Sequence, residues 1–126
     1  MMRVTVKTIA TLAGCAALAL APSSAVSQFN NPPVANPNGL SIYVCQTLVL
    51  NLTGNDTDPE GHYPLTVTAV DTSPYANIWI SSASSVTVEG VYAGGHSLSY
   101  TVEDSQGASS TGLISLGVFQ RYENCD

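Results

Sequence analysis

Short runs of alternating apolar and polar residues, separated by turn-forming residues, make up most of the chain after residue 28. A period of two is that of a β-strand with one buried face, and the 3.6-residue period of an amphipathic helix is missing from this part of the sequence. Seven runs can be distinguished, at residues 40–44, 48–52, 65–69, 78–80, 86–88, 98–102 and 114–118. The pattern predicts an all-β fold, a sandwich of seven strands around one shared core.

The segments between these runs are rich in Gly, Pro, Asp, Asn and Ser, the residues that favour turns. We expect turns at residues 54–61, 71–74, 94–95 and 105–107. Residues 28–39 are rich in Pro and Asn and are expected to form a linker-like segment before the sandwich. A length of 126 residues accommodates one domain, which we place at residues 40–126.

The first 27 residues have the layout of a secretory signal peptide. Arg3 and Lys7 precede an apolar run over residues 8–21, and small residues then lead to a cleavage position before Gln28. The apolar run is too short for a stable membrane span. The sequence therefore predicts an exported protein, secreted or periplasmic.

An alternative form of export lies within the same segment. Residues 12–15 (LAGC) resemble the lipobox of bacterial lipoproteins, in which the cysteine becomes the lipidated first residue. Against this interpretation, the residues that follow Cys15 are apolar, where a lipoprotein usually becomes polar. A lipoprotein anchored through Cys15 remains the alternative localisation.

The net negative charge of the chain after the signal peptide limits the kinds of molecule that it can bind. Without the signal peptide, Arg121 is the only Lys or Arg left beside nine acidic residues. Nucleic acid is excluded as a partner, since no basic patch could release counterions from a phosphate backbone. The acids could confer solubility or bind divalent cations.

Two of the three cysteines, Cys45 and Cys125, lie outside the signal peptide. An even number of cysteines in an exported chain indicates a disulfide, and two free thiols are the alternative. A bridge closing a loop of this length contributes about 4–5 kcal/mol in the chain-entropy model. Neither a CxxC pair nor a metal–thiolate spacing occurs.

Three segments together resemble a known family. They are residues 31–35 (NPPVA), residues 55–61 (NDTDPEG) followed by 64–70 (PLTVTAV), and residues 100–107 (YTVEDSQG). The chain is similar over about residues 30–119 to the bacterial cadherin-like and Ig-like repeats that occur in tandem in large surface proteins and adhesins. It departs from them in having a single copy of the domain, two cysteines, and His62 where the family often has an acid or Asn.

The resemblance implies a Greek-key sandwich in which loops far apart in sequence meet at one pole. It places Cys45 and Cys125 together at the opposite pole, in agreement with the disulfide inferred from counting. The residues that it gathers at the first pole carry side-chain oxygens: Asn30, Asn31, Asp56, Asp58 and Asp104.

Calcium is the cofactor that this set implies, because Ca²⁺ takes six to eight oxygens from carboxylates, amides and carbonyls. Glu60 is a further candidate ligand. We expect a weak site, with a Kd on the order of 10⁻⁴–10⁻³ M. The alternative is that the Asp-rich segment only forms a turn, since Asp side chains bond their own backbone.

No pattern supports catalysis. The serines lack a Gly-x-Ser-x-Gly elbow, and His62 and His96 lie on turns far apart with no third ligand, so we expect exposed turn histidines. Trp79 and Tyr75 are candidates for a ligand-binding aromatic surface, with core packing as the alternative.

The sequence thus predicts an exported, non-enzymatic binding or structural module associated with adhesion or the envelope. Its partner would be a protein or glycan at the cell surface. A secreted accessory domain that binds carbohydrate through exposed aromatics is the alternative. The resemblance to a fold family says little by itself about function.

Overall fold

The computed structural model describes residues 29–125, and the compact domain begins at Asn31. The predicted signal peptide, its cleavage position and Cys15 lie outside the described residues. Within residues 29–125 there is no helix long and apolar enough to cross a membrane.

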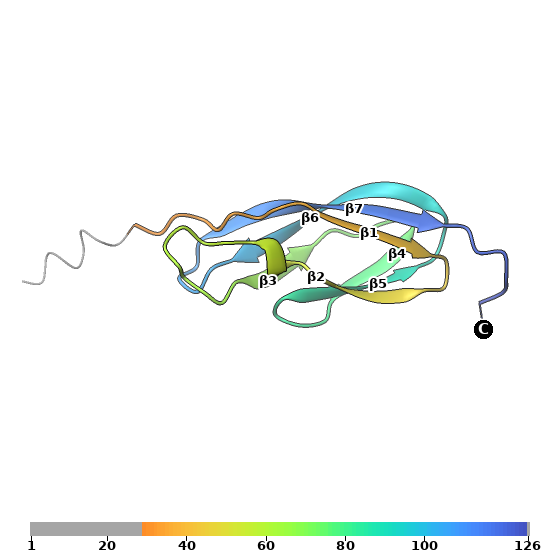
Figure 1. Cartoon of the computed structure of the whole chain (residues 1–126), viewed down its shortest axis with the longest axis horizontal. Helices are drawn as coiled ribbons and strands as arrows, with labels where there is room; N and C mark the ends of the chain where they lie inside the picture. The colour runs from red at the N-terminus through yellow and green to blue at the C-terminus, as the bar shows by residue number, and fades with distance from the viewer. Residues whose placement is uncertain (1–28, 126) are drawn as a thin grey trace, which may run out of the picture. The chain divides into compact units, whose positions relative to one another are not determined.

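In the described part of the chain, seven strands form two sheets, which confirms the predicted all-β sandwich (Figure 1). The four-stranded sheet has the order β1 (Asn38–Tyr43), β7 (Ser109–Phe119), β6 (Gly94–Glu103) and β3 (Thr66–Val70). The three-stranded sheet has the order β2 (Thr47–Asn51), β5 (Ser85–Gly90) and β4 (Ala76–Ile80). Strand β1 pairs in parallel with β7, and the other pairs are antiparallel. One 3₁₀ turn, Thr53–Asn55, follows β2.

The alternation seen in the sequence produces the core, because every second side chain of a strand faces the opposite sheet. Leu52 and Val102 are fully buried, and Tyr100 is 1 % exposed near the middle of the four-stranded sheet. The remaining buried apolar residues come from both sheets: Ile42, Leu65, Val67, Ala76, Val86, Val88, Leu98, Ile114, Leu116 and Val118.

Two details of the strand prediction were wrong. A β-bulge between Val67 and Ala69 shifts the register of β3, so Ala69 is exposed and Val70 packs on the core instead. Gly94 and Gly95, expected in a turn, begin strand β6. A glycine is needed at 94 because the ring of Tyr75 lies where a Cβ would project.

The segment expected to be linker-like lies against the domain from Asn31 onward. Val34 and Thr57 exchange two backbone hydrogen bonds, of 2.7 and 3.2 Å. Strand β1 follows at Asn38, two residues before its expected start. The beginning of the domain is therefore tied to the segment that connects β2 and β3.

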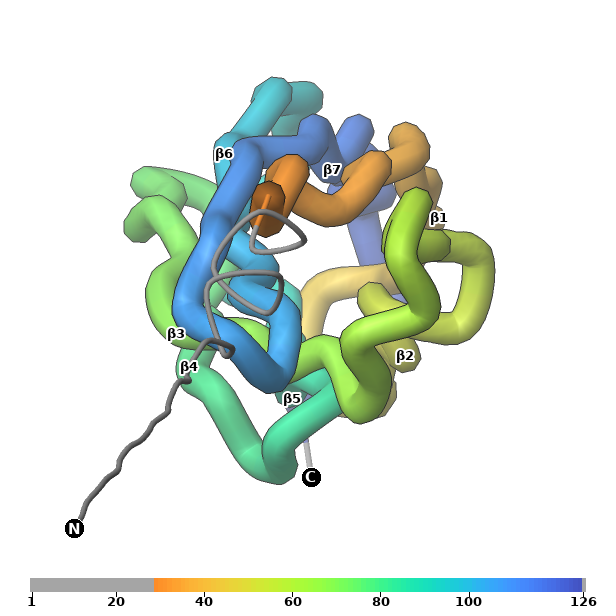
Figure 2. The backbone as a smooth tube through the Cα atoms, turned by 90° about the vertical axis from the view of Figure 1, so that its left-hand side faces the viewer, coloured from red at the N-terminus to blue at the C-terminus, as the bar shows by residue number. Residues whose placement is uncertain are grey.

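Loops gather at the two ends of the sandwich. One end, which we call the N-terminal pole, holds the start of the domain, the β2–β3 segment and the β6–β7 turn (Figure 2). The other end, the cysteine pole, holds Cys45 after β1 and Cys125 after β7. Their Cα atoms are 5.5 Å apart, which is the distance typical of a disulfide.

Candidate functional site

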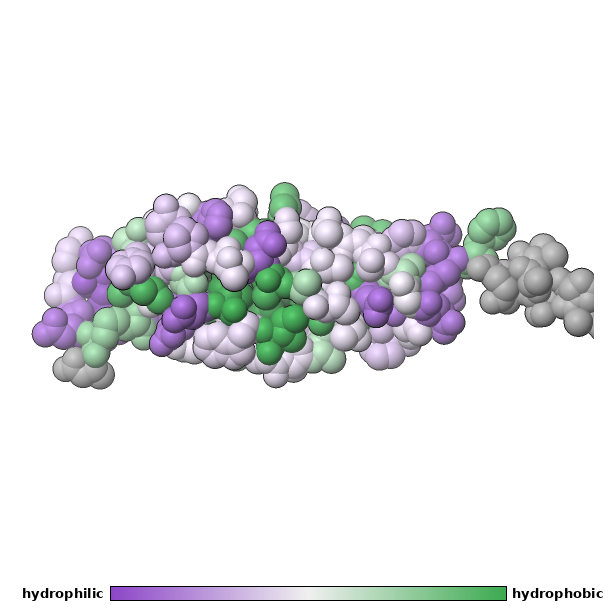
Figure 3. Space-filling view, turned by 180° about the vertical axis from the view of Figure 1, so that it is seen from behind, coloured by the Kyte–Doolittle hydropathy of each residue, from purple (hydrophilic) through white to green (hydrophobic). Residues whose placement is uncertain are grey.

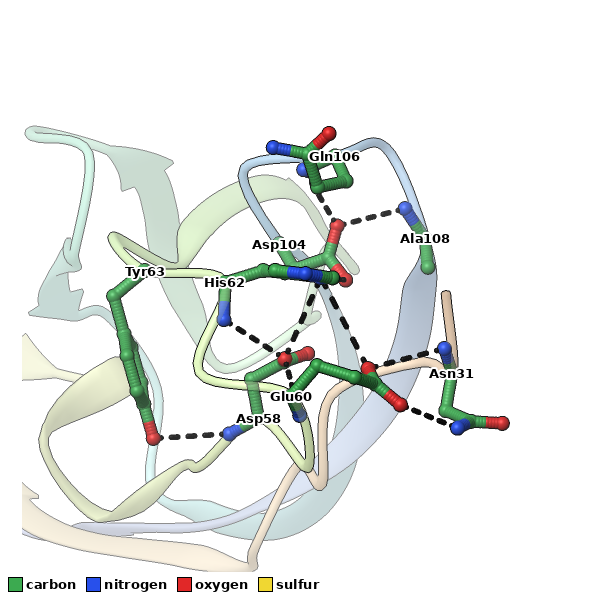
Figure 4. Close-up of polar contacts among 8 residues, drawn as sticks. All are labelled: Asn31, Asp58, Glu60, His62, Tyr63, Asp104, Gln106 and Ala108. Atoms are coloured by element: carbon green, nitrogen blue, oxygen red, sulfur yellow. Dashed lines mark hydrogen bonds and ion pairs between the residues drawn. The ribbon is translucent and has the colours of Figure 1, made fainter. Parts of the chain in front are cut away.

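Four ionisable side chains meet at the N-terminal pole (Figure 4). Asp58, Glu60 and His62 come from the β2–β3 segment, and Asp104 directly follows β6. The Nδ1 atom of His62 lies 3.8 Å from an Asp58 oxygen, 3.9 Å from a Glu60 oxygen and 3.8 Å from an Asp104 oxygen. Three of these residues, Asp58, Glu60 and His62, each have a ligand atom within 4.8 Å of the ligand atoms of the other two. These three groups could therefore hold a metal ion.

The backbone of the β2–β3 segment positions three of these side chains. Asp58 Oδ2 accepts hydrogen bonds from the amides of Glu60 and His62, both at 3.0 Å. Gly61 has a φ of 78°, a left-handed conformation that glycine adopts without strain. The chain consequently turns back on itself here, and His62 faces the acids that precede it.

Asp104 is held in a similar way on the β6–β7 turn. Its Oδ1 atom accepts hydrogen bonds from the amides of Gln106 and Ala108, both at 2.9 Å. The Ser105 amide donates to the His62 carbonyl oxygen at 3.0 Å, which joins this turn to the β2–β3 segment. Backbone amides therefore fix one oxygen of each aspartate.

Asn31 orients the third carboxylate. Its amide donates to Glu60 Oε1 at 3.2 Å, and its side-chain nitrogen donates to Glu60 Oε2. Asn31 was expected to supply an oxygen to a cation, and in the structure it contacts Glu60 through its nitrogens (Figure 4).

Burial makes the charge of this cluster costly. The side chains of Asp58 and Asp104 are 0 % exposed, while those of Glu60 and His62 are 24 % and 29 % exposed. Within residues 29–125, the buried Oδ1 atom of Asp58 has no hydrogen-bond partner. A buried carboxylate oxygen without a donor is unfavourable, so the arrangement favours a cation beside it.

Asp56 faces a different environment. Its two carboxylate oxygens lie 3.1 and 2.9 Å from the hydroxyl of Tyr100, and Oδ1 also accepts a 2.8 Å bond from the Asn36 amide. Burial, with the Asp56 carboxylate as a second cause, raises the pKa of Tyr100 well above its ordinary value. Asp56 thus joins the start of the domain to the core. Asn30, another residue predicted to bind the cation, lies just before the first residue of the domain.

The two candidate aromatics lie in different surroundings. Trp79 is 46 % exposed on the edge strand β4, in register with Thr87 of β5. Tyr75 packs on Gly94 and lies edge-on to the His96 ring, with the centroids 6.1 Å apart. The side of the domain opposite to β1 and β2 shows an apolar patch at its middle (Figure 3).

His62 is not the exposed turn residue without partners that the sequence predicts, because its side chain is 29 % exposed and lies beside three carboxylates. The pattern that could have revealed it is the alternation of Asp58, Glu60 and His62 across a glycine. A turn at Gly61 brings alternate side chains to one side, but the contribution of Asp104 depends on how the strands are arranged.

Comparisons with known proteins identify the fold family. The family described as bacterial Ig domain matches the chain at residues 30–117. No curated protein matches. Among solved structures, the chain is similar to an endo-fucoidan hydrolase of glycoside hydrolase family 107, with 20 % identity and a TM-score of 0.49. The match covers 78 % of this chain and 19 % of the hydrolase chain.

Two small domains are also similar in structure. The PKD domain of the KIAA 1837 protein is 13 % identical, with a TM-score of 0.44 and coverage of 79 % of this chain and 97 % of that one. A domain of titin is 11 % identical, with a TM-score of 0.41 and coverage of 74 % and 99 %.

Proposed function

Because the chain belongs to the bacterial Ig domain family, we propose that it is an exported, non-enzymatic module with a structural or binding role at the cell surface. Domains of this family are typically extracellular and non-catalytic, which supports both parts of the proposal. The paired positions of Cys45 and Cys125 suit an oxidising compartment outside the cytoplasm.

The N-terminal pole gives this module a more specific property, the binding of a divalent cation. The observation that carries the proposal is the buried Oδ1 atom of Asp58, which has no donor while amides fix the other oxygen of the same carboxylate. Calcium is the ion that the carboxylate-rich sequence suggests, with Asp58, Glu60 and Asp104 as side-chain ligands. Asp56 would act from outside the site, since Tyr100 and Asn36 take its oxygens.

Thermal unfolding with added CaCl₂ tests this property. A ligand that binds only the folded state raises its stability by RT ln(1 + [L]/Kd). At about 10 mM calcium, roughly ten times the weaker Kd expected, we predict a clear rise in Tm that EDTA reverses. Asp58→Asn should remove the response and Glu123→Gln, an exposed acid near the cysteine pole, should keep it. An unchanged Tm at that concentration would remove calcium from the proposal.

Export can be tested independently of the cation. Amino-terminal sequencing of the protein recovered from the periplasm or medium should begin at Gln28. A chain that starts at a lipid-modified Cys15 would instead establish the lipoprotein. Recovery of the intact chain from the cytoplasm alone would contradict export.

The exposed indole of Trp79 favours one second candidate, a carbohydrate-binding accessory domain. Glycan-array binding that Trp79→Ala abolishes, with the fold intact by circular dichroism, would support it. Tyr92→Ala is a suitable control because Tyr92 is an exposed aromatic outside β4, 66 % exposed. Tyr75 contributes little to such a surface, because its ring packs on Gly94.

A further inference from the structure

We infer that the cation site at the N-terminal pole takes a divalent transition-metal ion of the zinc class in preference to calcium, with His62 as one of its ligands. The inference rests on the cation-binding role proposed above and names the class of ion. The observation behind it is the position of the His62 imidazole, whose Nδ1 atom lies within 3.9 Å of three separate carboxylates.

The spacing of the four groups suits a small ion. Four ligands at Zn²⁺ bond lengths of about 2.0–2.2 Å lie about 3.3–3.6 Å from one another in a tetrahedron. His62 Nδ1 lies 3.8 Å from Asp58 Oδ2, 3.9 Å from Glu60 Oε1 and 3.8 Å from Asp104 Oδ2. The ligand atoms of Asp58, Glu60 and His62 all lie within 4.8 Å of one another, so these side chains would draw together by up to about 1 Å to reach tetrahedral spacing. Glu60 and His62, the two partly exposed members, have room to make that adjustment.

Ligand chemistry separates the two classes of ion more sharply than spacing does. Calcium prefers six to eight oxygens, and an imidazole nitrogen in the centre of the cluster occupies a position that an oxygen would fill. Imidazole suits Zn²⁺ and its transition-metal neighbours, which bind with coordination number four. The cluster supplies four side chains of the kinds that Zn²⁺ accepts. They are the carboxylates of Asp58, Glu60 and Asp104 and the imidazole of His62.

The surroundings of the cluster fix its ligands in advance. Amides of Glu60 and His62 hold one oxygen of Asp58, and the buried Oδ1 atom is left without a donor, in a side chain that is 0 % exposed. Amides of Gln106 and Ala108 hold one oxygen of Asp104. Hydrogen bonds of this kind orient metal ligands and strengthen binding. A purely turn-forming role would explain why backbone amides bind one oxygen of each aspartate. It would not explain why Asp58 Oδ1 is buried without a donor.

The experiment titrates the purified, metal-free protein with ZnCl₂ and, separately, with CaCl₂, and follows Tm and heats of binding. We expect Zn²⁺ to bind one per chain and to raise Tm at a concentration at least tenfold below that at which Ca²⁺ acts. Loss of a residue that only hydrogen-bonds to a metal ligand weakens metal binding by about 10–100-fold. His62→Gln removes a ligand itself, so it should weaken Zn²⁺ binding by more than that, while Ca²⁺ binding changes little.

His96→Gln is the matched control, since His96 is the second histidine of the chain and contacts Ser73 and Tyr75 outside the cluster. It should keep the response to Zn²⁺ unchanged. His62→Asp makes the cluster all-oxygen, and we expect it to reverse the preference in favour of Ca²⁺. This variant gives a gain of calcium binding, a result that a merely unfolded protein could not produce.

Two results would overturn the inference and leave the proposed cation site standing. One is Ca²⁺ binding as tight as Zn²⁺ binding, which would leave the proposed cation site intact and retire only its transition-metal character. The other is a Zn²⁺ response that His62→Gln does not weaken. A protein that responds to neither ion would contradict both the inference and the proposed cation site.

Discussion

Replacing Tyr100 by Phe isolates the contact between the core and the start of the domain. The Tyr100 side chain is 1 % exposed, and its hydroxyl lies 2.9 Å from one oxygen of Asp56 and 3.0 Å from the carbonyl oxygen of Asn36. Phenylalanine keeps the ring and opens no large cavity. The substitution therefore measures the hydroxyl and its hydrogen bonds.

The loss of stability can be estimated from the Asp56 carboxylate, which loses the hydroxyl as a hydrogen-bond donor. A hydrogen bond to a charged group contributes about 1.5–3 kcal/mol, and a buried acceptor that loses its donor is costly. Asp56 is 6 % exposed and keeps only the 2.8 Å bond from the Asn36 amide. We expect Tyr100→Phe to lower the free energy of unfolding by about 2 kcal/mol. At about 4–8 °C per kcal/mol for a domain of this size, Tm should fall by about 8–16 °C.

Urea unfolding followed by tryptophan fluorescence at neutral pH provides the assay, since Trp79 is the only tryptophan. Tyr122→Phe is the control, because Tyr122 is 98 % exposed and its loss should change stability by less than about 0.5 kcal/mol. A double-mutant cycle with Asp56→Ala should give a coupling energy between about 0.5 and 3 kcal/mol. A coupling near zero would refute the reasoning, whatever the stability of the single variants.

Three further predictions concern the same domain. Because burial and Asp56 raise the pKa of Tyr100 above its ordinary value of 10.0, the folded protein keeps this proton to higher pH than the unfolded chain does. The free energy of unfolding should thus fall above about pH 10, by up to about 1.4 kcal/mol per pH unit, and urea unfolding of Tyr100→Phe at several pH values should lack that component. Replacing Cys45 and Cys125 together by Ser should cost up to about 4–5 kcal/mol, and an unchanged urea midpoint, or a free-thiol count of two in the native protein, would contradict a disulfide. Gly112→Ala should destabilise the domain by about 1–3 kcal/mol, since its Cβ would lie 2.6 Å from the Tyr100 ring, whereas Gly39→Ala has open space and should melt like the native protein.

The period-two alternation was sufficient to predict the fold because the long strands β6 and β7 bury alternate residues along most of their length. It failed at Ala69, where a bulge reverses the faces, since a one-residue irregularity cannot be seen in a pattern of residue types. It failed again at Gly94 and Gly95, because glycines occur in strands as well as turns when a ring such as that of Tyr75 needs the space.

The candidate site was harder to predict because it depends on where side chains point. Asp56 and Asp58 are two residues apart and looked equivalent in the sequence, yet one faces Tyr100 and the other faces His62. The direction of each is set by the amides and hydroxyls that it meets, several of which come from other segments. The contact between His62 and Asp104 could be recognised only once the packing of the β6–β7 turn placed the two residues side by side.

The positions of Cys45 and Cys125 have a mechanical consequence. A disulfide between them would join the end of β1 directly to Cys125, a few residues beyond the end of β7. Tension applied between Asn31 and Cys125 would then pass through about 15 residues, which span at most about 50 Å when extended, instead of more than about 300 Å for the whole domain. Since β1 is already extended, a pull along the chain would lengthen the oxidised domain very little even if its sheets came apart. The reduced domain would instead carry the load through the hydrogen bonds between the parallel strands β1 and β7, and would extend fully once they separated.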